Sequence, residues 1–210
     1  MRFSRQDDRL GEVRTLARGI ANEKILIRAS RVAAGWAFFY ALYRWYYAAG
    51  GTVGMFGTPV SADQWRRINA VGGAIIFVMA VLPLVLFGSW RRPRARPALL
   101  TLCWLMAVGC VVHALIGITQ RIASLSGAYA IPFPFWTTID RTQSDLQALL
   151  FNEPWFLIEG LLWAAIAWGG ALSASSRRWW WIGSALAGTG ILTTIGLLSA
   201  FGVIGKVIIG

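Results

Sequence analysis

The sequence has few of the residues from which most active sites and metal centres are built. Its 210 residues include one histidine, two cysteines and nine acidic residues. A single histidine, His113, excludes a haem held by two histidines, and a zinc site on Cys110 and His113 would need distant carboxylates. Cys103 and Cys110 form no CxxC pair, which excludes the redox motif of a thiol oxidoreductase. We therefore expect no metal and no cofactor.

Long apolar runs dominate the chain, whereas charged residues are scarce. Hydrophobic residues make up 57% of the sequence and charged residues 14%, which are not the proportions of an ordinary soluble domain. Runs of about 20 residues, the length that crosses the hydrocarbon core of a bilayer, recur along the chain. The sequence therefore predicts an all-α, polytopic membrane helix bundle over residues 32–206. Its five predicted transmembrane spans are Val32–Thr52, Ile68–Trp90, Leu99–Ile122, Pro154–Leu172 and Trp180–Ile204.

The net charge of +11 is concentrated in three segments. Fourteen of the 20 basic residues lie before the first span, between the second and third, or between the fourth and fifth. These segments share one side of the membrane if the spans alternate, so the positive-inside rule predicts a cytoplasmic N-terminus and an external C-terminus. Arg66 and Arg67 fall on the outer side, against this trend. The clustering indicates orientation, and we expect no nucleic-acid partner.

Residues 1–31 mix arginines with acidic residues and carry apolar residues at roughly helical spacing. This pattern predicts an amphipathic helix on the cytoplasmic membrane surface, where anionic lipid attracts it. A cleaved signal peptide is not expected, because the charged region is too long. Arginine outnumbers lysine by 18 to 2, a bias typical of GC-rich bacterial genes. We therefore expect the protein in the inner membrane of a bacterium.

Two further segments are predicted from their composition. Residues 123–153 form a long outer loop, whose first part is aromatic and extended because two prolines disfavour helix. Its second part predicts a short helix capped by Thr137 or Thr138. The fifth span carries small residues at four-residue spacing, which permits close packing within the chain or against a partner. Residues 183–202 are therefore a predicted contact surface for a membrane protein or a second copy.

Ionisable residues inside apolar spans are costly, so each needs a partner and suggests a functional site. Helical spacing places them on stripes of the first, third and fourth spans, which converge in the outer half of the predicted bundle. There Arg44 and Arg121 can neutralise Glu159 and Glu153. The simpler interpretation is that Arg44 reaches the lipid headgroups and the tyrosines form an aromatic belt. The candidate ligand-binding residues are Tyr40, Tyr43, Arg44, Tyr47, His113, Gln120, Arg121, Glu153 and Glu159.

Catalysis has little support in the sequence. Serines 173, 175 and 176 lie toward the cytoplasmic boundary, whereas His113 lies deeper and toward the other side. No GxSxG motif and no phosphate-binding loop occurs. One acid–base option is left, in which Glu159 is a general acid toward a lipid-like substrate, and His113 is the other weak candidate. The sequence leaves open whether the protein is an enzyme.

Two stretches follow a recurring pattern. The residues concerned are Gly50, Gly51, Thr52 and Gly54 after the first span, and Arg141, Asp145 and Pro154 before the fourth. An aromatic helix end, a Gly-Gly-Thr-aromatic-Gly turn and a later Arg, Asp and Pro segment resemble a family of small bacterial multi-pass membrane proteins catalogued as a domain of unknown function. Val53 replaces the common aromatic, and the interval before the proline is longer. The resemblance covers about residues 36–168 and implies no reaction.

Three functional hypotheses follow. The first is a non-catalytic accessory or scaffold subunit of a membrane complex that packs through its fifth span. It predicts that the polar stripes satisfy one another and leave no cavity. The second is a membrane enzyme or a binding protein for a lipid-like ligand, with an outward-facing pocket. The third is a small transporter, although no inverted repeat or pair of broken helices supports it.

Overall fold

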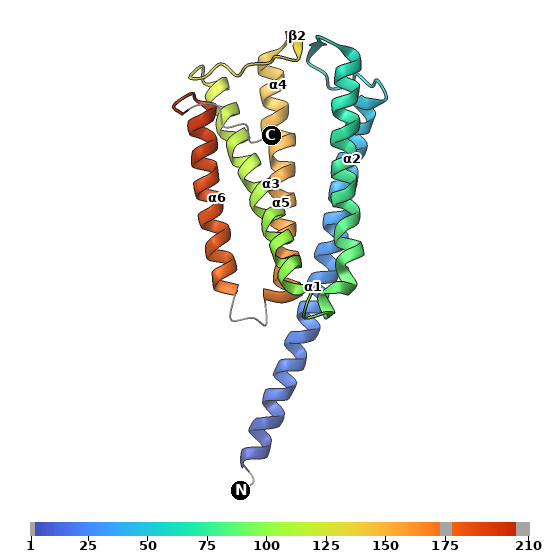
Figure 1. Ribbon diagram of the computed structural model, residues 1–210, viewed down its shortest axis with the longest axis vertical. Coiled ribbons are helices and arrows are strands. Elements are labelled where there is room, and N and C mark those ends of the chain that lie inside the picture. The colour runs from blue at the N-terminus through green and yellow to red at the C-terminus, as the bar shows by residue number, and fades with distance from the viewer. Residues whose placement is uncertain (1–2, 173–177, 205–210) are drawn as a thin grey trace.

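The computed structural model describes residues 3–172 and 178–204, which form a mostly helical bundle (Figure 1). It contains five helices that are long and apolar enough to cross a membrane, so this part of the prediction is confirmed. The helices of the bundle are α1 (Phe3–Ala48), α2 (Ala62–Leu86), α3 (Arg96–Leu125), α4 (Arg141–Gln147), α5 (Glu153–Ala167) and α6 (Arg178–Ala200).

Helix α1 is one continuous element, with no break at the predicted boundary near residue 31. Its candidate membrane span is Gly19–Ala48, which begins before the predicted Val32. Figure 1 shows the first part of α1 projecting beyond the other helices. The end of the bundle from which α1 projects is called the N-terminal end, and the opposite end, where two short strands pair, is called the sheet end. The difference arises because helical hydrogen bonding continues through residues whose polarity had suggested a separate segment.

The fourth span is also longer than predicted, because α4 and α5 are joined by helix rather than by loop. The π-helical segment η2 (Ala148–Asn152) connects them, and a second one, η3 (Trp168–Leu172), follows α5. The latter part of the predicted outer loop 123–153 is therefore the first turns of this helix, and its candidate span is Arg141–Gly170. Its N-cap is Asp140, which accepts the Gln143 N–H at 3.0 Å, and not Thr137 or Thr138.

Segment η2 explains how the helix passes Pro154. Proline has no N–H, so it cannot donate to the carbonyl of Leu150 as an α-helix requires. The preceding N–H, that of Glu153, instead reaches the carbonyl of Ala148, five residues back. This wider turn keeps the backbone hydrogen-bonded, as an apolar environment demands.

Two short strands were not predicted from the sequence, although the first part of the outer loop was expected to be extended. Strand β1 (Gly57–Pro59) pairs antiparallel with β2 (Trp136–Ile139), joining the loop after α1 to the loop after α3. Gly57 allows this approach, because a Cβ there would lie 2.1 Å from the carbonyl oxygen of Thr138. The pairing satisfies backbone groups of two loops that the helices bring together.

The helices pack in two groups that share α5. Helix α1 packs along α2 and α5, and α3 packs along α5 and α6. Helices α2 and α3 follow each other through the 3-10 segment η1 (Phe87–Arg91), yet they do not pack along each other within the described residues. The hydrophobic core lies toward the N-terminal end, around Leu26, Ala33, Trp90, Leu99, Cys103, Ala107, Trp163 and Ile166.

Small residues bring the core helices close. A Cβ at Gly160 would lie 2.9 Å from the carbonyl oxygen of Ala107, so α5 meets the backbone of α3 there. A Cβ at Gly169 would lie 2.6 Å from the amide nitrogen of Leu26, so η3 meets α1 in the same way. The apolar contacts of this half therefore depend on the absence of side chains at these two positions.

Helix α6 lies at the edge of the bundle and contacts α3. Only 6% of the residues in its most apolar stretch are buried inside the structure. A Cβ at Gly188 would lie 2.8 Å from the Trp104 ring, and one at Gly196 would lie 2.2 Å from Ile116. Two small residues of the predicted contact surface 183–202 are therefore used for packing within the chain.

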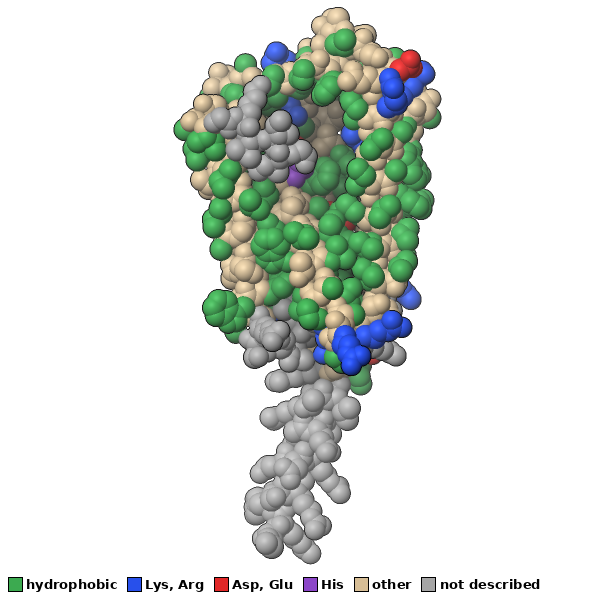
Figure 2. Space-filling model, in the orientation of Figure 1, with side chains coloured by type: hydrophobic (Ala, Val, Ile, Leu, Met, Phe, Trp, Pro, Cys, Tyr) green, Lys and Arg blue, Asp and Glu red, His purple; other side chains and the backbone are tan. Residues whose placement is uncertain are grey.

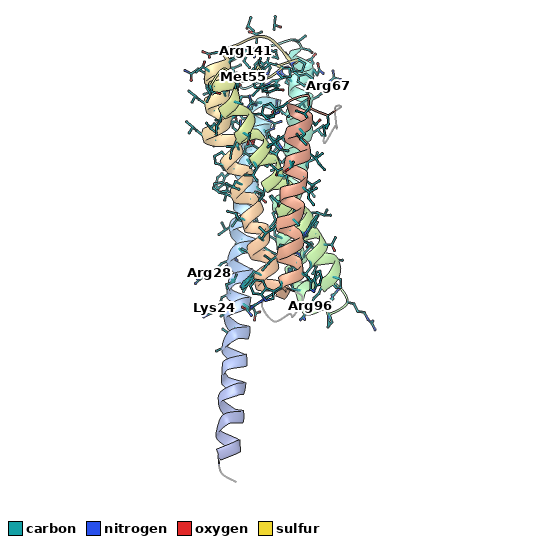
Figure 3. All side chains as sticks on the ribbon, turned by 90° about the vertical axis from the view of Figure 1, so that its left-hand side faces the viewer. Lys24, Arg28, Met55, Arg67, Arg96 and Arg141 are labelled. Carbon is teal, nitrogen blue, oxygen red and sulfur yellow. The ribbon has the colours of Figure 1, made fainter. Side chains whose placement is uncertain are left out.

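Charged side chains gather at the two ends of the bundle. Figure 3 shows Lys24, Arg28 and Arg96 at the N-terminal end, and Arg67 and Arg141 at the sheet end. The middle of the face drawn in Figure 2 is mainly hydrophobic. This arrangement fits a protein whose middle lies in hydrocarbon.

We predict that Gly160→Ala destabilises the bundle, because its methyl group would press on the α3 backbone. Overpacking of this kind costs roughly 1–3 kcal/mol, which outweighs the better helix propensity of alanine. The apparent melting temperature in detergent, followed by tryptophan fluorescence, should fall by several degrees. Gly190→Ala is the matched control, because a Cβ at Gly190 on α6 meets nothing within 4 Å. Equal melting temperatures for the two variants would contradict the prediction.

Candidate ligand-binding hollow

Three adjoining cavities lie in the sheet half of the bundle, and Arg121 lines all of them. The loop cavity, of about 200 Å³, lies against the loops that carry β1 and β2. The central cavity, of about 400 Å³, lies among α1, α2, α3 and α5. The α6 cavity, of about 450 Å³, lies between α3 and α6. We call the three together the hollow. Figure 2 shows the surface hollowed there, with basic side chains and the histidine visible inside.

Tyrosines of α1 build the wall between the central and loop cavities. Tyr40 is buried at 4% exposure and donates to Asn152 Oδ1 at 3.3 Å. Gln147 Nε2 donates to Tyr43 Oη at 3.0 Å, and Tyr47 Oη donates to the carbonyl of Val53 at 3.0 Å. These bonds attach α1 to the α4–η2–α5 helix and to the first loop. The tyrosines therefore have fixed positions, and their hydroxyls add polarity to the lining.

Arg44 lines both the loop cavity and the central cavity. Among the described residues it forms no ion pair and no hydrogen bond, and its guanidinium lies over Gly72, where a Cβ would be 3.3 Å from Nη2. The predicted pairing with Glu159 is therefore wrong. Glu159 is buried at 4% exposure, does not line the hollow, and accepts from Trp163 Nε1 at 2.9 Å. A guanidinium in such a cavity is available to an anionic group.

Glu153 lines the central and α6 cavities and is 6% exposed. Its carboxylate occupies the space left open by Gly117, since a Cβ there would lie 2.2 Å from Oε2. Within residues 3–172 and 178–204, Oε2 has no hydrogen-bond partner, and His113 Nε2 is 3.8 Å away. The His113 side chain is 59% exposed, and its ring lies edge-on to that of Phe156, with the ring centroids 4.4 Å apart. A buried oxygen without a donor is costly unless a ligand or water supplies one.

The sequence predicted that Arg121 pairs with Glu153, and this prediction is wrong. Arg121 pairs with Asp145 instead. Arg121 Nη1 lies 2.7 Å from Asp145 Oδ1, and Ser124 Oγ donates to Oδ2 at 2.5 Å. The Asp145 side chain is 2% exposed, and that of Arg121 is 21% exposed. This pair attaches α4 to α3. It also neutralises Arg121, so that Arg44 is left as the unpaired cation of the described lining.

Helical periodicity found part of the lining. Eight of the nine candidate residues line the hollow, and Glu159 is the exception. The sequence analysis missed Gln147, Asn152 and Phe156, which lie beside Glu153 on one helix. A signal existed, because Gln147 and Asn152 are polar residues within an otherwise apolar stretch. Gly72 was also missed, since it has no side chain to indicate a site.

The described residues offer little for metal binding, and of the two weak catalytic candidates only His113 lines the hollow. Within residues 3–172 and 178–204, no group of three or more His, Cys, Asp or Glu is arranged to hold a metal ion. Cys103 and Cys110 are buried free thiols. Glu159, the candidate general acid, is separated from the hollow, so a ligand in the hollow would not contact it. The arrangement is suited to binding by charge and hydrogen bonds.

Comparison of the chain with protein-family models, with curated proteins and with solved structures finds no significant match. The resemblance to a family of small multi-pass proteins therefore stays a prediction, and the function has to be argued from the hollow itself.

We predict that Asp145→Asn destabilises the protein strongly, because it leaves the Arg121 guanidinium partly buried without a counter-charge. Breaking a buried pair costs roughly 3 kcal/mol. Asp63→Asn is the matched control, because Asp63 is 81% exposed in a pair with Arg66 at 3.9 Å. Such a surface pair is worth less than about 1 kcal/mol. Thermal melts in detergent should separate the two variants clearly, and equal losses would contradict the assigned role of Asp145.

Proposed function

We propose that this chain is an integral membrane protein that binds an amphipathic ligand through an anionic group in the hollow. The observation that carries the proposal is the Arg44 guanidinium, which has no ion-pair partner among the described residues and lines two adjoining cavities. A cation at this depth is expensive unless an anion or water meets it, which makes it a functional residue by default. Tyr40, Tyr43 and Asn152 supply hydroxyl and amide groups around it.

Membrane insertion is supported by the five apolar helices and by the charges at both ends of the bundle. The concentration of basic residues at the N-terminal end favours a cytoplasmic N-terminus under the positive-inside rule. The sheet end, with the hollow, would then lie in the outer half of the membrane. The arginine-rich composition supports the inner membrane of a bacterium as the location.

A ligand-binding role has more support than the accessory or scaffold role. The scaffold hypothesis requires polar stripes that satisfy one another and leave no cavity. Instead the central and α6 cavities measure about 400 and 450 Å³, within the range of small-molecule sites. The partner surface 183–202 is weakened as an argument, because Gly188 and Gly196 already pack on α3.

We predict that Arg44→Leu abolishes retention of an amphipathic ligand that carries an anionic group. The protein would be purified in mild detergent, and co-purifying phospholipids would be identified by native mass spectrometry. Wild type should retain about one such molecule per chain, and Arg44→Leu should lose it because the counter-charge of the anionic group is gone. Arg67→Leu is the control, since Arg67 lies on α2 at the same end but is exposed and bonds to the Asp63 carbonyl. Undiminished retention in Arg44→Leu would refute the proposal.

We also predict the orientation from the charge distribution. In a background with Cys103 and Cys110 replaced by alanine, a membrane-impermeant maleimide applied to intact cells should label Ser126→Cys at the sheet end. It should label Arg94→Cys, at the N-terminal end, only after lysis. The reverse pattern would place the N-terminus outside and contradict the proposed orientation.

A further inference from the structure

One side of the central cavity faces the surroundings of the bundle, and the other side faces the interior of the protein. On one side it is lined by Gly72, Ile75 and Ile76 of α2, and on the other by residues of α3 and α5. Helices α2 and α3 do not pack along each other in the described part of the chain, and Figure 1 shows them apart at the sheet end. Ile75 is 58% exposed. In a membrane this lateral opening between α2 and α3 faces hydrocarbon.

The two edges of this opening differ in polarity. The α2 edge is apolar, with Ile75 and Ile76, whereas polar residues such as Arg44 and Glu153 line the cavity from α1 and α5, and α3 adds further polar residues at the other edge. An amphipathic molecule matches this arrangement when its headgroup lies inside and its chains lie along α2. A cavity of about 400 Å³ accommodates a headgroup, while acyl chains extend through the opening into the bilayer.

Two unsatisfied groups of opposite character define the headgroup. Arg44 has no anion among the described residues, so it requires a group such as a phosphate. Glu153 is 94% buried, since its exposure is 6%, and no residue in the described part of the chain donates a hydrogen bond to its Oε2. A ligand that satisfies both carries a phosphate and, beyond it, a hydrogen-bond donor.

We propose that the ligand is a phospholipid whose headgroup ends in a donor, an ammonium or a hydroxyl, and that it enters from the bilayer between α2 and α3. Its phosphate binds Arg44, and its terminal donor binds Glu153. This inference rests on the proposed function and adds the class of ligand and the route of entry. A headgroup with a quaternary ammonium has no donor, so phosphatidylcholine should be discriminated against.

The first test compares lipids with identical chains. Delipidated protein in detergent is titrated with phosphatidylethanolamine, phosphatidylglycerol or phosphatidylcholine, and bound lipid is measured by native mass spectrometry. Hydrogen bonds to charged groups predict that the two donor lipids bind about tenfold more tightly than phosphatidylcholine. Glu153→Gln should reduce this preference to about threefold or less. Glu159→Gln is the matched control, because Glu159 is a buried carboxylate outside the hollow, and it should keep the full preference.

The second test locates the route. A photo-reactive phenylalanine analogue at Ile76, which lines the opening, should crosslink added phosphatidylethanolamine in a manner that Arg44→Leu abolishes. At Val78, which is 60% exposed on α2 and does not line the cavity, crosslinking should be insensitive to Arg44→Leu. Equal crosslinking at Ile76 with and without Arg44→Leu would contradict lipid entry through this opening.

The outcomes separate this inference from the proposed function. Equal binding of the three lipids, or an unchanged preference in Glu153→Gln, overturns the donor-headgroup assignment while leaving an Arg44-dependent site. Binding of glycerophosphoethanolamine or inorganic phosphate as tight as that of the lipids overturns the bilayer route and identifies a soluble phosphate ligand. Failure of all these probes to bind, together with no effect of Arg44→Leu on co-purifying molecules, refutes the proposed function and this inference with it.

Discussion

The buried ion pair between Arg121 and Asp145 is the constraint on which the sheet half of the structure depends. Its two charged atoms are 2.7 Å apart, and Ser124 completes the coordination of the carboxylate. Separating the charges in an environment of low dielectric constant would be costly, so α4 is held against α3. Because α4, η2 and α5 form one helix, this single attachment also sets the positions of Gln147, Asn152 and Glu153.

The same pair explains why the hollow keeps unsatisfied charges. Arg121 is already neutralised by Asp145, so Glu153 does not gain it as a hydrogen-bonded partner. Arg44 is on a different helix and has no carboxylate within pairing distance in the described chain. The cation and the carboxylate therefore stay available to something that enters the space between them.

The two halves of the bundle differ in what occupies the spaces between helices. Toward the N-terminal end, the small residues Ala33, Ala167 and Gly169 let α1 approach the end of α5 and the segment η3 closely. Trp163 fills the remaining space. Toward the sheet end, aromatic side chains fill the space between α1 and α5: Trp36 stacks on Trp155 at 4.0 Å, and Tyr40 stacks on Trp155 at 5.3 Å. The half of the bundle toward the N-terminal end is thus closely packed, whereas the sheet half contains the cavities.

By itself the sequence determined the five apolar helices and eight of the residues that line the hollow, because hydrophobic run length and helical periodicity are local properties. Tyr40, Tyr43, Arg44 and Tyr47 share one face of the first helix, whatever the fold. The same holds for His113, Gln120 and Arg121 on the third helix. Only the tertiary structure decided which charges pair. Asp145 had been placed in a short helix of the outer loop, separate from the fourth span. It became the partner of Arg121 because that helix continues through the π-helical segment η2 into α5 and packs against α3. Charge pairing depends on the rotation and depth of each helix relative to its neighbours, which no local pattern encodes.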